Sequence, residues 1–188
     1  APMHSPAPQP ASPTPDARAI RHAYRTVRAQ AGPAQAITVL HIGAEHTAVA
    51  TGQGDTEAAT LVLNMGVRAT ARAFFRRSPP TPLEMENAIA SVEDEVVRVQ
   101  PLLPPGSALW SIDPVVRDIA LMAGVAPGAG MVLPLGAMEQ TFERLAAVAE
   151  GRPVGQEGLP ESTEFAAALL ILREFMHHLG FSAVHVGD

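Results

Sequence analysis

The sequence predicts an α/β protein in which helices pack on a sheet, and three observations support this class. Three short runs rich in β-branched residues, separated by turn residues, occupy positions 36–65. Segments of helical periodicity follow them, interrupted by further short apolar runs. The composition, 47% hydrophobic and 17% charged over 188 residues, is that of one globular domain with a substantial core. We therefore expect layers of helices against a sheet.

The first three strands are expected at 36–42, 46–51 and 59–65. The first run is mostly apolar and β-branched, as in a largely buried strand, and Gly43 ends it. The Gly-Gln-Gly-Asp sequence after the second run signals a turn, and Gly66 closes the third. These segments predict a three-strand antiparallel meander in a mixed sheet.

A helical pattern precedes the meander, with Asp16 as its expected N-cap. A stripe of Ile20, Tyr24 and Val27 faces the core, and Gly32-Pro33 stops the helix. The arginines of this segment face away from the stripe, so we expect them in solvent: Arg18, Arg21, Arg25 and Arg28.

Helices dominate the chain after residue 66. One is expected at 67–77, and Thr81 as N-cap, with Pro82 at the first helical position and Glu84 in the first turn, starts another that runs to about residue 102. Asp113-Pro114 opens a later helix. The helix at 161–179 is apolar on most sides in its middle, as in a helix buried against a sheet. The remaining expected segments are a strand at 108–112, a Gly/Pro-rich loop to about 134, a helix at 135–150, an irregular stretch at 151–160 and a final strand within 183–188.

Composition and charge exclude several classes of partner. The net charge is −6, the pI is near 5.6 and none of the 13 basic residues is lysine, so we expect no DNA or RNA partner. No apolar run reaches the roughly eighteen residues that span a bilayer, and no signal-peptide core lies near the start, so no membrane partner is expected. The absence of cysteine excludes disulfides, a thiolate nucleophile and a Cys-based zinc site, and fits a cytoplasmic protein.

The first fifteen residues differ in composition from the rest. They hold six prolines among Ala, Ser, Gln and Thr, which predicts an extended, disordered linker at 1–15. A PxxP ligand for an aromatic groove is an alternative, but no basic residues flank it. Residues 16–188 are expected to form a single domain.

The turn after the first strand is a candidate anion site. Its glycine, threonine and small residues can aim several backbone N–H groups at one point, which is how proteins hold phosphate. An ordinary hairpin is the alternative, with Gly43 serving only an unusual φ. His41, Glu45 and His46 could be imagined as metal ligands, but strand neighbours alternate sides and no fourth ligand is evident, so no metal site is predicted.

Two other constellations have simpler explanations. His177 and His178 lie near a helix C-terminus, where the helix dipole favours a cation. Ser111 with Asp113 and a histidine lacks the glycines that flank a hydrolase nucleophile. Neither group is expected to be catalytic on this evidence.

The element order of three strands, helices, a strand, helices and a strand fits an RNase H-like domain, although periodicity does not separate this from other α/β meanders. Five segments, taken in order, resemble the C-terminal part of the exopolyphosphatase and guanosine pentaphosphate phosphatase family, two-lobed relatives of the actin-like ATPases. They are Asp-Ala-Arg-Ala-Ile at 16–20, Leu-Asn-Met-Gly-Val-Arg at 63–68, Phe75 with Ser-Pro-Pro-Thr-Pro-Leu-Glu at 78–84, Gly-Leu-Pro-Glu at 158–161 with Leu-Leu-Ile-Leu at 169–172, and Val-His-Val-Gly-Asp at 184–188.

The resemblance covers 16–188 and implies an RNase H-like (actin-like ATPase) lobe, with the family's first lobe lying upstream of Ala1. It implies hydrolysis of a terminal phosphoanhydride of polyphosphate or pppGpp, with Mg²⁺ and a carboxylate that acts as general base on water. The family's catalytic Glu falls on Asp16, which shortens its reach by about 1.5 Å. The implied phosphate-binding positions are Gly43, Ala44, Glu45, His46 and Thr47 in the first Gly-rich loop, and Ser111 and Asp113 in the second.

Departures from the family pattern oppose this activity. His41 replaces the first loop's carboxylate, the Glu45 carboxylate would repel phosphate, and the second loop has no glycine and adds the anion of Asp113. Arg72 stands where a Glu is usual, and Ser162 lacks the Arg of the last-helix motif. Because each lost donor is worth roughly a hundred- to a thousandfold in rate, little catalysis should remain. We therefore favour a pseudoenzyme, that is, a non-catalytic module. It would bind a partner, a nucleotide, or a second copy of the chain as a homodimer. The alternative is an active hydrolase of polyphosphate or a nucleotide.

Overall fold

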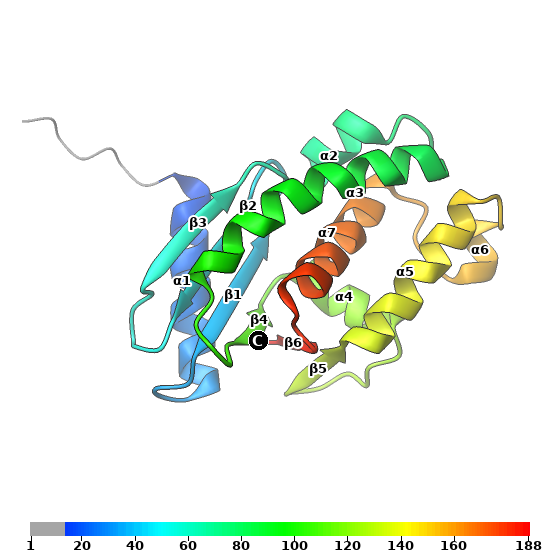
Figure 1. The fold of residues 1–188 in the computed structure, drawn as a ribbon. Helices are drawn as coiled ribbons and strands as arrows, with labels where there is room; N and C mark the ends of the chain where they lie inside the picture. Colours follow the sequence, from blue (N-terminus) through cyan, green and yellow to red (C-terminus); the bar gives the residue numbers. More distant parts are fainter. Residues whose placement is uncertain (1–13) are drawn as a thin grey trace, which may run out of the picture.

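The computed structural model describes residues 14–188, which form a six-stranded mixed sheet with helices on both faces (Figure 1). The strand order is β3-β2-β1-β4-β6-β5. The first three strands pair antiparallel as a meander, β1–β4 and β4–β6 are parallel, and β5 is antiparallel to β6. The strands are β1 Ile37–Ile42, β2 Thr47–Gly52, β3 Ala59–Leu63, β4 Ala108–Ser111, β5 Met131–Pro134 and β6 Ala183–Val186. The predicted α/β class and the meander are confirmed.

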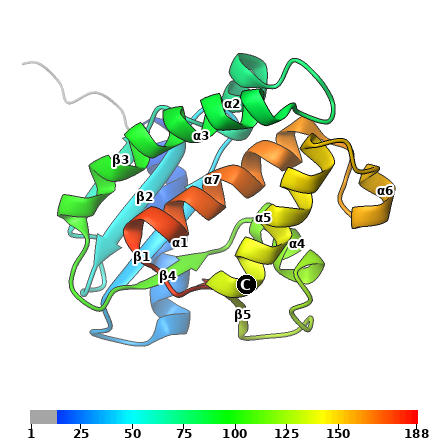
Figure 2. The same cartoon turned by 45° about the vertical axis from the view of Figure 1, so that its right-hand side comes forward.

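The helices divide unequally between the two faces. Helix α1 packs on β1 and β2 on one face, and α7 lies on the other side of the sheet, flanked by α3 and α5 (Figure 2). The helical elements are α1 Pro15–Ala31, α2 Val67–Phe74, α3 Pro82–Val96, the 3₁₀ segment η1 Val97–Leu102, α4 Pro114–Met122, α5 Leu135–Ala149, α6 Val154–Glu157 and α7 Thr163–Leu179. Among these described helices, none has the length and apolarity required to cross a bilayer.

Strand β1 has a core on each side. Its alternate residues Ile37 and Val39 pack with the apolar stripe of α1, while Leu40 and Ile42 belong to the larger core beneath α7. This follows from the period-two alternation of side chains in a strand. Because both faces of the strand are covered, its sequence is nearly continuously apolar.

Helix α7 is buried on all sides through its middle. Every residue from Ala166 to Leu172 is buried, as are Phe175 and Met176. Ser162 caps the helix by accepting a hydrogen bond from the N–H of Phe165 at 3.1 Å, and Gly180 ends it in the left-handed conformation. The predicted buried helix is confirmed, with its start at residue 163.

Helix α1 begins earlier than predicted. Its N-cap is Thr14, whose side chain accepts a hydrogen bond from the N–H of Ala17, and Pro15 is the first helical residue. Proline suits this position because it has no N–H to leave unpaired, and Asp16 is favoured in the first turn by the helix dipole. Asp16 as N-cap was therefore wrong. Of the predicted linker, residues 1–13 lie outside the described residues, while Pro15 is helical.

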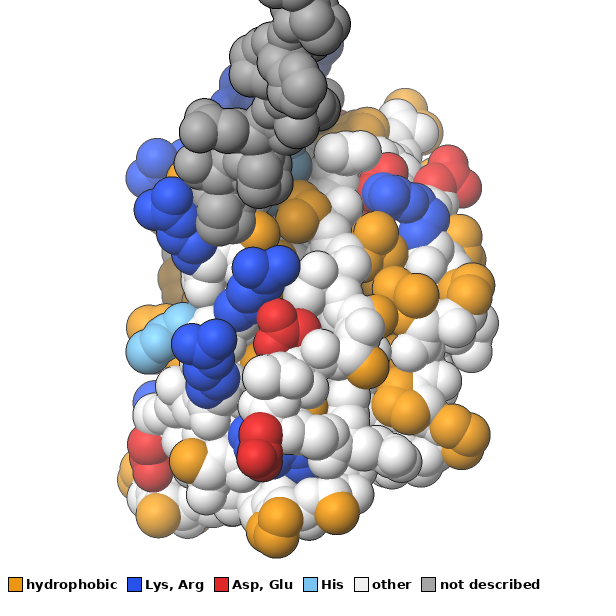
Figure 3. Space-filling view, turned by 90° about the vertical axis from the view of Figure 1, so that its left-hand side faces the viewer, with side chains coloured by type: hydrophobic (Ala, Val, Ile, Leu, Met, Phe, Trp, Pro, Cys, Tyr) orange, Lys and Arg blue, Asp and Glu red, His pale blue; other side chains and the backbone are white. Residues whose placement is uncertain are grey.

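Arg28 is buried, contrary to the expectation of a solvated arginine. Its guanidinium donates to the carbonyl oxygens of Gly54 at 2.9 Å and Gln35 at 2.7 Å, and to the Tyr24 hydroxyl at 2.9 Å. These bonds tie the end of α1 to the β2–β3 turn. The other arginines of α1 are exposed: Arg18, Arg21 and Arg25. Figure 3 shows the left-hand side of Figure 1, where α1 and β3 lie, and several basic side chains are visible on this surface.

Strand β5 lies in a segment predicted to be a loop. Its residues alternate between buried Met131 and Leu133 and exposed Val132 and Pro134, and it forms an edge of the sheet beside β6. Four residues give only two periods of alternation, too few to stand out among neighbouring glycines and prolines. The stretch predicted to be irregular holds the short helix α6, and the last six residues predicted for α3 form η1, which contains Pro101.

Helix α1 leaves part of its face of the sheet uncovered. There Trp110 of β4 stacks on His185 of β6 with ring centroids 4.8 Å apart. Val132 pairs with His185 across β5 and β6 and is 37% exposed. Burial lowers the pKa of His185 from its usual value of 6.5.

Thr81 is the N-cap of α3, as predicted, and forms a capping box with Glu84. The Thr81 hydroxyl accepts a hydrogen bond from the N–H of Glu84 at 3.2 Å, and the Glu84 carboxylate accepts one from the N–H of Thr81 at 2.9 Å. The hydrogen bond from the Thr81 N–H holds the pKa of the Glu84 carboxyl below its usual value.

We expect Thr81→Ala to lower the free energy of unfolding by about 1 kcal/mol, because the N–H of Glu84 then loses its acceptor. Chemical denaturation followed by circular dichroism measures this loss. Thr81→Ser keeps the hydroxyl and should retain most of the stability. If serine destabilised the protein as much as alanine, the cap would not be the cause.

Candidate functional site

The candidate site lies where β1 extends beyond its parallel neighbour β4. Ile37 pairs with Ala108 and Val39 with Trp110, so the same register places Asp113 opposite Ile42. Strand β4 ends at Ser111, which leaves the N–H of Ile42 without a strand partner on that side. The Asp113 carboxylate occupies this place and accepts the Ile42 N–H through Oδ2 at 2.7 Å. A side chain thus replaces the next backbone acceptor of the sheet.

His41 binds the second oxygen of the same carboxylate. Its Nδ1 lies 2.7 Å from Asp113 Oδ1, and Asp113 is only 6% exposed. The hydrogen bond to the Asp113 carboxylate is the largest influence on this imidazole and raises its pKa above 6.5, against the opposing effect of burial. Asp113 stands at the N-cap of α4, as predicted, but its side chain bonds to β1 and not to its own helix.

A backbone hydrogen bond closes the turn between β1 and β2. Gly43 donates its N–H to the carbonyl oxygen of His46 at 2.9 Å. A Cβ at residue 43 would lie 2.5 Å from that oxygen, so the close approach requires glycine. Asp16 is adjacent, since its Oδ2 is 3.4 Å from Nδ1 of His46. The structure therefore brings the predicted residues Asp16, Gly43 and His46 together.

The carbonyl oxygens of this turn occupy the N-terminus of α2. Val67 donates its N–H to the Gly43 carbonyl at 2.9 Å, and Arg68 donates to the Ala44 carbonyl at 2.9 Å. A Cβ at Gly66 would come within 2.4 Å of the Ala44 oxygen. The N–H groups that make a helix N-terminus attractive to anions are therefore already bonded here.

Two ion pairs lie near the turn and α2. Arg72 holds Glu45 at 2.8 Å, and Arg68 holds Glu164 of α7 at 3.3 Å. The hydrogen bond from Arg72 holds the pKa of the Glu45 carboxyl below its usual value. All four side chains are about half exposed or more, so we assign these pairs little stability.

A pocket of about 430 Å³ opens beside the turn, at the carboxyl end of β1 and the N-termini of α4 and α7. Its described lining includes two carboxylates, Asp113 and Glu164, and one imidazole, His41, which is bonded to Asp113; no arginine is among the lining residues. The lining residues are His41, Ile42, Gly43, Ala44, Val67, Asp113, Pro114, Val115, Ser162, Glu164, Phe165 and Ala168.

The predicted phosphate-binding residues are divided by this geometry. Gly43, Ala44 and Asp113 line the pocket, whereas Glu45 pairs with Arg72. Thr47 and Ser111 are fully buried, and neither is among the lining residues. The Ser111 hydroxyl instead accepts the N–H of Asp113 at 3.2 Å.

Other lining residues were not singled out from the sequence. Val115, Glu164 and Phe165 reach the pocket because the N-termini of α4 and α7 converge on the end of β1. Glu164 is an ordinary first-turn acid in the sequence. Only the tertiary arrangement places it at the site.

The sequence matches no family model and no curated protein. Solved structures do match. A Ppx/GppA family member from Aquifex aeolicus superposes with a TM-score of 0.73 at 19% identity, covering 93% of this chain and 58% of that protein. The fold resembles that of Ppx/GppA structures. An exopolyphosphatase from Cytophaga hutchinsonii gives a TM-score of 0.68 at 13% identity, covering 88% of this chain and 57% of that one.

These likenesses show the fold of the chain. This chain spans less than two thirds of each of these proteins. The predicted layer fold is confirmed, and the resemblance to the exopolyphosphatase and guanosine pentaphosphate phosphatase family is confirmed at the level of the fold. The roles carried over to individual residues stay predictions.

The His41–Asp113 pair predicts a pH-dependent stability. A histidine whose pKa is raised on folding stabilises the folded state most below its unfolded pKa, and the stabilisation is lost as the pH rises through the folded value. We expect the difference in unfolding free energy between wild type and His41→Gln to be largest below about pH 6.5 and to shrink at higher pH. Urea denaturation between about pH 5.5 and 8.5 measures it. A difference that grows with pH would contradict the raised pKa.

Proposed function

We propose that this chain is a phosphatase-fold domain that no longer hydrolyses phosphoanhydrides and acts as a binding or regulatory module. The observation that carries the proposal is the electrostatic character of the pocket. Its lining presents an anion with two carboxylates, Asp113 and Glu164, the second of which is paired with Arg68, and with one imidazole that is bonded to Asp113. Polyphosphate or the 5′ end of a nucleotide would enter a site with no free cation among the described lining residues.

The backbone of the site supports the same conclusion. The Gly43 N–H and the first N–H groups of α2 are bonded within the protein, which removes donors that could hold a phosphate. The side chains of Ala44 and Glu45 replace hydrogen atoms where close approach of the backbone to phosphate would favour glycine. Losing one such donor costs roughly a hundred- to a thousandfold in rate, so several losses leave little catalysis.

Magnesium, the ion implied for phosphoanhydride hydrolysis, does not fit these residues. Both oxygens of Asp113 already accept hydrogen bonds, from Ile42 and His41, and Asp16 faces the imidazole of His46. Mg²⁺ requires oxygen ligands in near-octahedral geometry and usually binds carboxylates together with substrate phosphates. We therefore derive no catalytic step through this ion.

The pocket is better suited to a ligand that is neutral or cationic where it enters. Ile42, Val67, Val115 and Phe165 supply apolar surface, and Glu164 supplies a carboxylate acceptor at the N-terminus of α7. Sites of this kind, largely apolar with a few placed polar groups, are typical of small-molecule or side-chain recognition. A partner protein or a second copy of the chain that inserts such a group is consistent with the module.

An active hydrolase is the second candidate, and one observation favours it. Asp16 Oδ1 would lie 3.4 Å from a Cβ at Gly43, so the residue carried over as general base stands beside the turn carried over as phosphate loop. A base in that position could act on a water directed at a terminal phosphate. This candidate also requires a further domain to close the cleft.

Phosphate release from polyphosphate and pppGpp, measured on the full-length protein with Mg²⁺, tests the proposal. We expect background release from wild type and an equal value from Asp16→Ala. Asp118→Ala, which changes an exposed aspartate of α4, is the matched control. Release by wild type and Asp118→Ala that disappears in Asp16→Ala would overturn the binding module and establish the hydrolase.

A further inference from the structure

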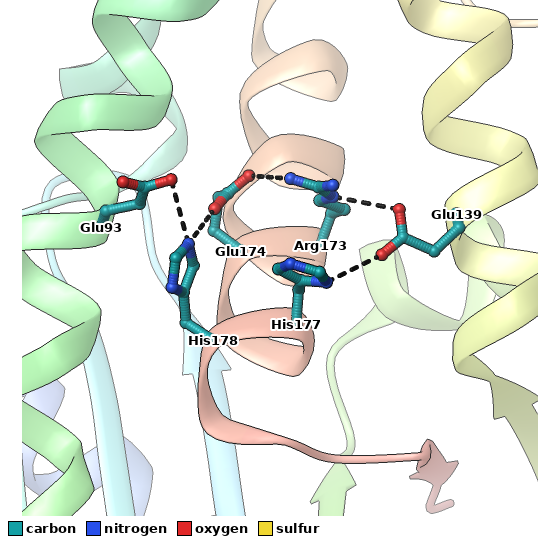
Figure 4. A network of polar contacts seen from close by, with 6 residues as sticks. All are labelled: Glu93, Glu139, Arg173, Glu174, His177 and His178. Atoms are coloured by element: carbon teal, nitrogen blue, oxygen red, sulfur yellow. Dashed lines mark hydrogen bonds and ion pairs between the residues drawn. The ribbon is translucent and has the colours of Figure 1, made fainter.

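Three potential metal ligands meet between α3 and α7, at the opposite end of α7 from the pocket (Figure 4). Glu93 comes from α3, and Glu174 and His178 come from α7. One ligand atom from each lies within 4.8 Å of the other two. Glu174 and His178 are four residues apart, so their side chains share one face of the helix, and α3 packs against that helix.

The atoms of this cluster face a common point. Nε2 of His178 lies 2.9 Å from Oε2 of Glu174 and 3.0 Å from Oε1 of Glu93. One imidazole nitrogen can donate one proton to one acceptor at a time. Two carboxylate oxygens and a nitrogen therefore converge where a single proton cannot satisfy all of them.

Glu174 provides the second observation. Its side chain is 0% exposed, on a helix that is otherwise apolar through its middle. Arg173 donates to its Oε1 at 2.6 Å, but Oε2, which points into the cluster, is approached by Nε2 of His178 at 2.9 Å without a hydrogen bond of good geometry and accepts none from the other described residues. A buried carboxylate oxygen without a donor is costly unless it binds a cation.

The charged groups around the cluster have an excess of negative charge that a divalent cation could balance. On the α5 side, Arg173 and His177 both contact Glu139, at 3.1 Å and 3.2 Å. The carboxylates of Glu93, Glu139 and Glu174 carry three negative charges, and the guanidinium of Arg173, which contacts Glu139 and Glu174, carries one positive charge. One divalent ion would offset the remaining two negative charges.

We propose that Glu93, Glu174 and His178 bind one divalent transition-metal ion of the zinc class and so connect α3 to α7. Zinc is bound in proteins by imidazole nitrogen together with carboxylate oxygen. Mg²⁺ and Ca²⁺ prefer oxygen ligands alone, so the histidine selects against them. Glu93 is 40% exposed and His178 31% exposed, which gives the ion access from solvent and leaves its remaining positions to water.

A protonated His178 that pairs with both carboxylates is the alternative occupant of this space. The two differ in their response to acid, because a metal requires the neutral imidazole and is displaced by protons, whereas the imidazolium is formed by them. Acidification is therefore expected to weaken zinc binding.

Isothermal titration of the EDTA-treated protein with Zn²⁺ at about pH 7.5 tests the proposal. We expect one ion per chain and a rise in Tm with added Zn²⁺, because the ion binds only the folded arrangement. Glu93→Gln and His178→Gln should each weaken binding by about tenfold or more. Glu93→Gln changes a partly exposed side chain, so folding should survive, and circular dichroism verifies this.

Matched controls separate this site from adventitious binding at surface histidines. His177→Gln removes the adjacent imidazole, and Glu86→Gln removes an exposed carboxylate of the same helix as Glu93. Both should bind Zn²⁺ as wild type does. The proposal is overturned if wild type shows no saturable binding, if Glu93→Gln and His178→Gln bind unchanged, or if His177→Gln weakens binding as much as His178→Gln.

Discussion

The burial of α7 is the constraint on which the structure depends. Helices α2, α3, α4 and α5 all pack against it, and its apolar side chains share one core with β1, β4 and β6. Burying a large aliphatic side chain contributes about 1.5–3 kcal/mol, so the buried residues of α7 make a large contribution to the hydrophobic stabilisation of the domain. Its position also sets the chemistry at both of its ends. The N-terminus forms one wall of the pocket, and near the C-terminus it carries Glu174 into the interior.

The sequence predicts those elements whose signal is local and repeated. The all-round apolar middle of α7, the Thr81 N-cap and the meander were predicted because periodicity and capping act over a few neighbouring residues. Strand β5 was not predicted because it forms by pairing with β6 at the edge of the sheet, and this pairing leaves little signal in its own four residues. Arg28 was misplaced because the carbonyl oxygens it binds belong to residues up to 26 positions away.

The features of the candidate site also separate into those that the sequence predicted and those that depend on tertiary contacts. Gly43 was selected from the residues of its turn and Asp16 and Asp113 through a family resemblance, and the structure places all three at one end of the sheet. The bond between Asp113 and Ile42 spans 71 residues and exists because β4 is shorter than β1, which no local pattern reveals. The bonding of turn carbonyls to α2 likewise depends on tertiary register. These contacts, more than the substitutions themselves, decide whether the turn has donors left for an anion.

The stack of Trp110 on His185 gives the molecule an intrinsic optical reporter. The chain has a single tryptophan, so its fluorescence arises from one place, the part of the sheet that α1 leaves uncovered. The neighbouring imidazole changes charge on titration, and indole emission is sensitive to a charge at such short range. Binding of a molecule to this surface would therefore be detectable as a change in the Trp110 emission spectrum, without an added label.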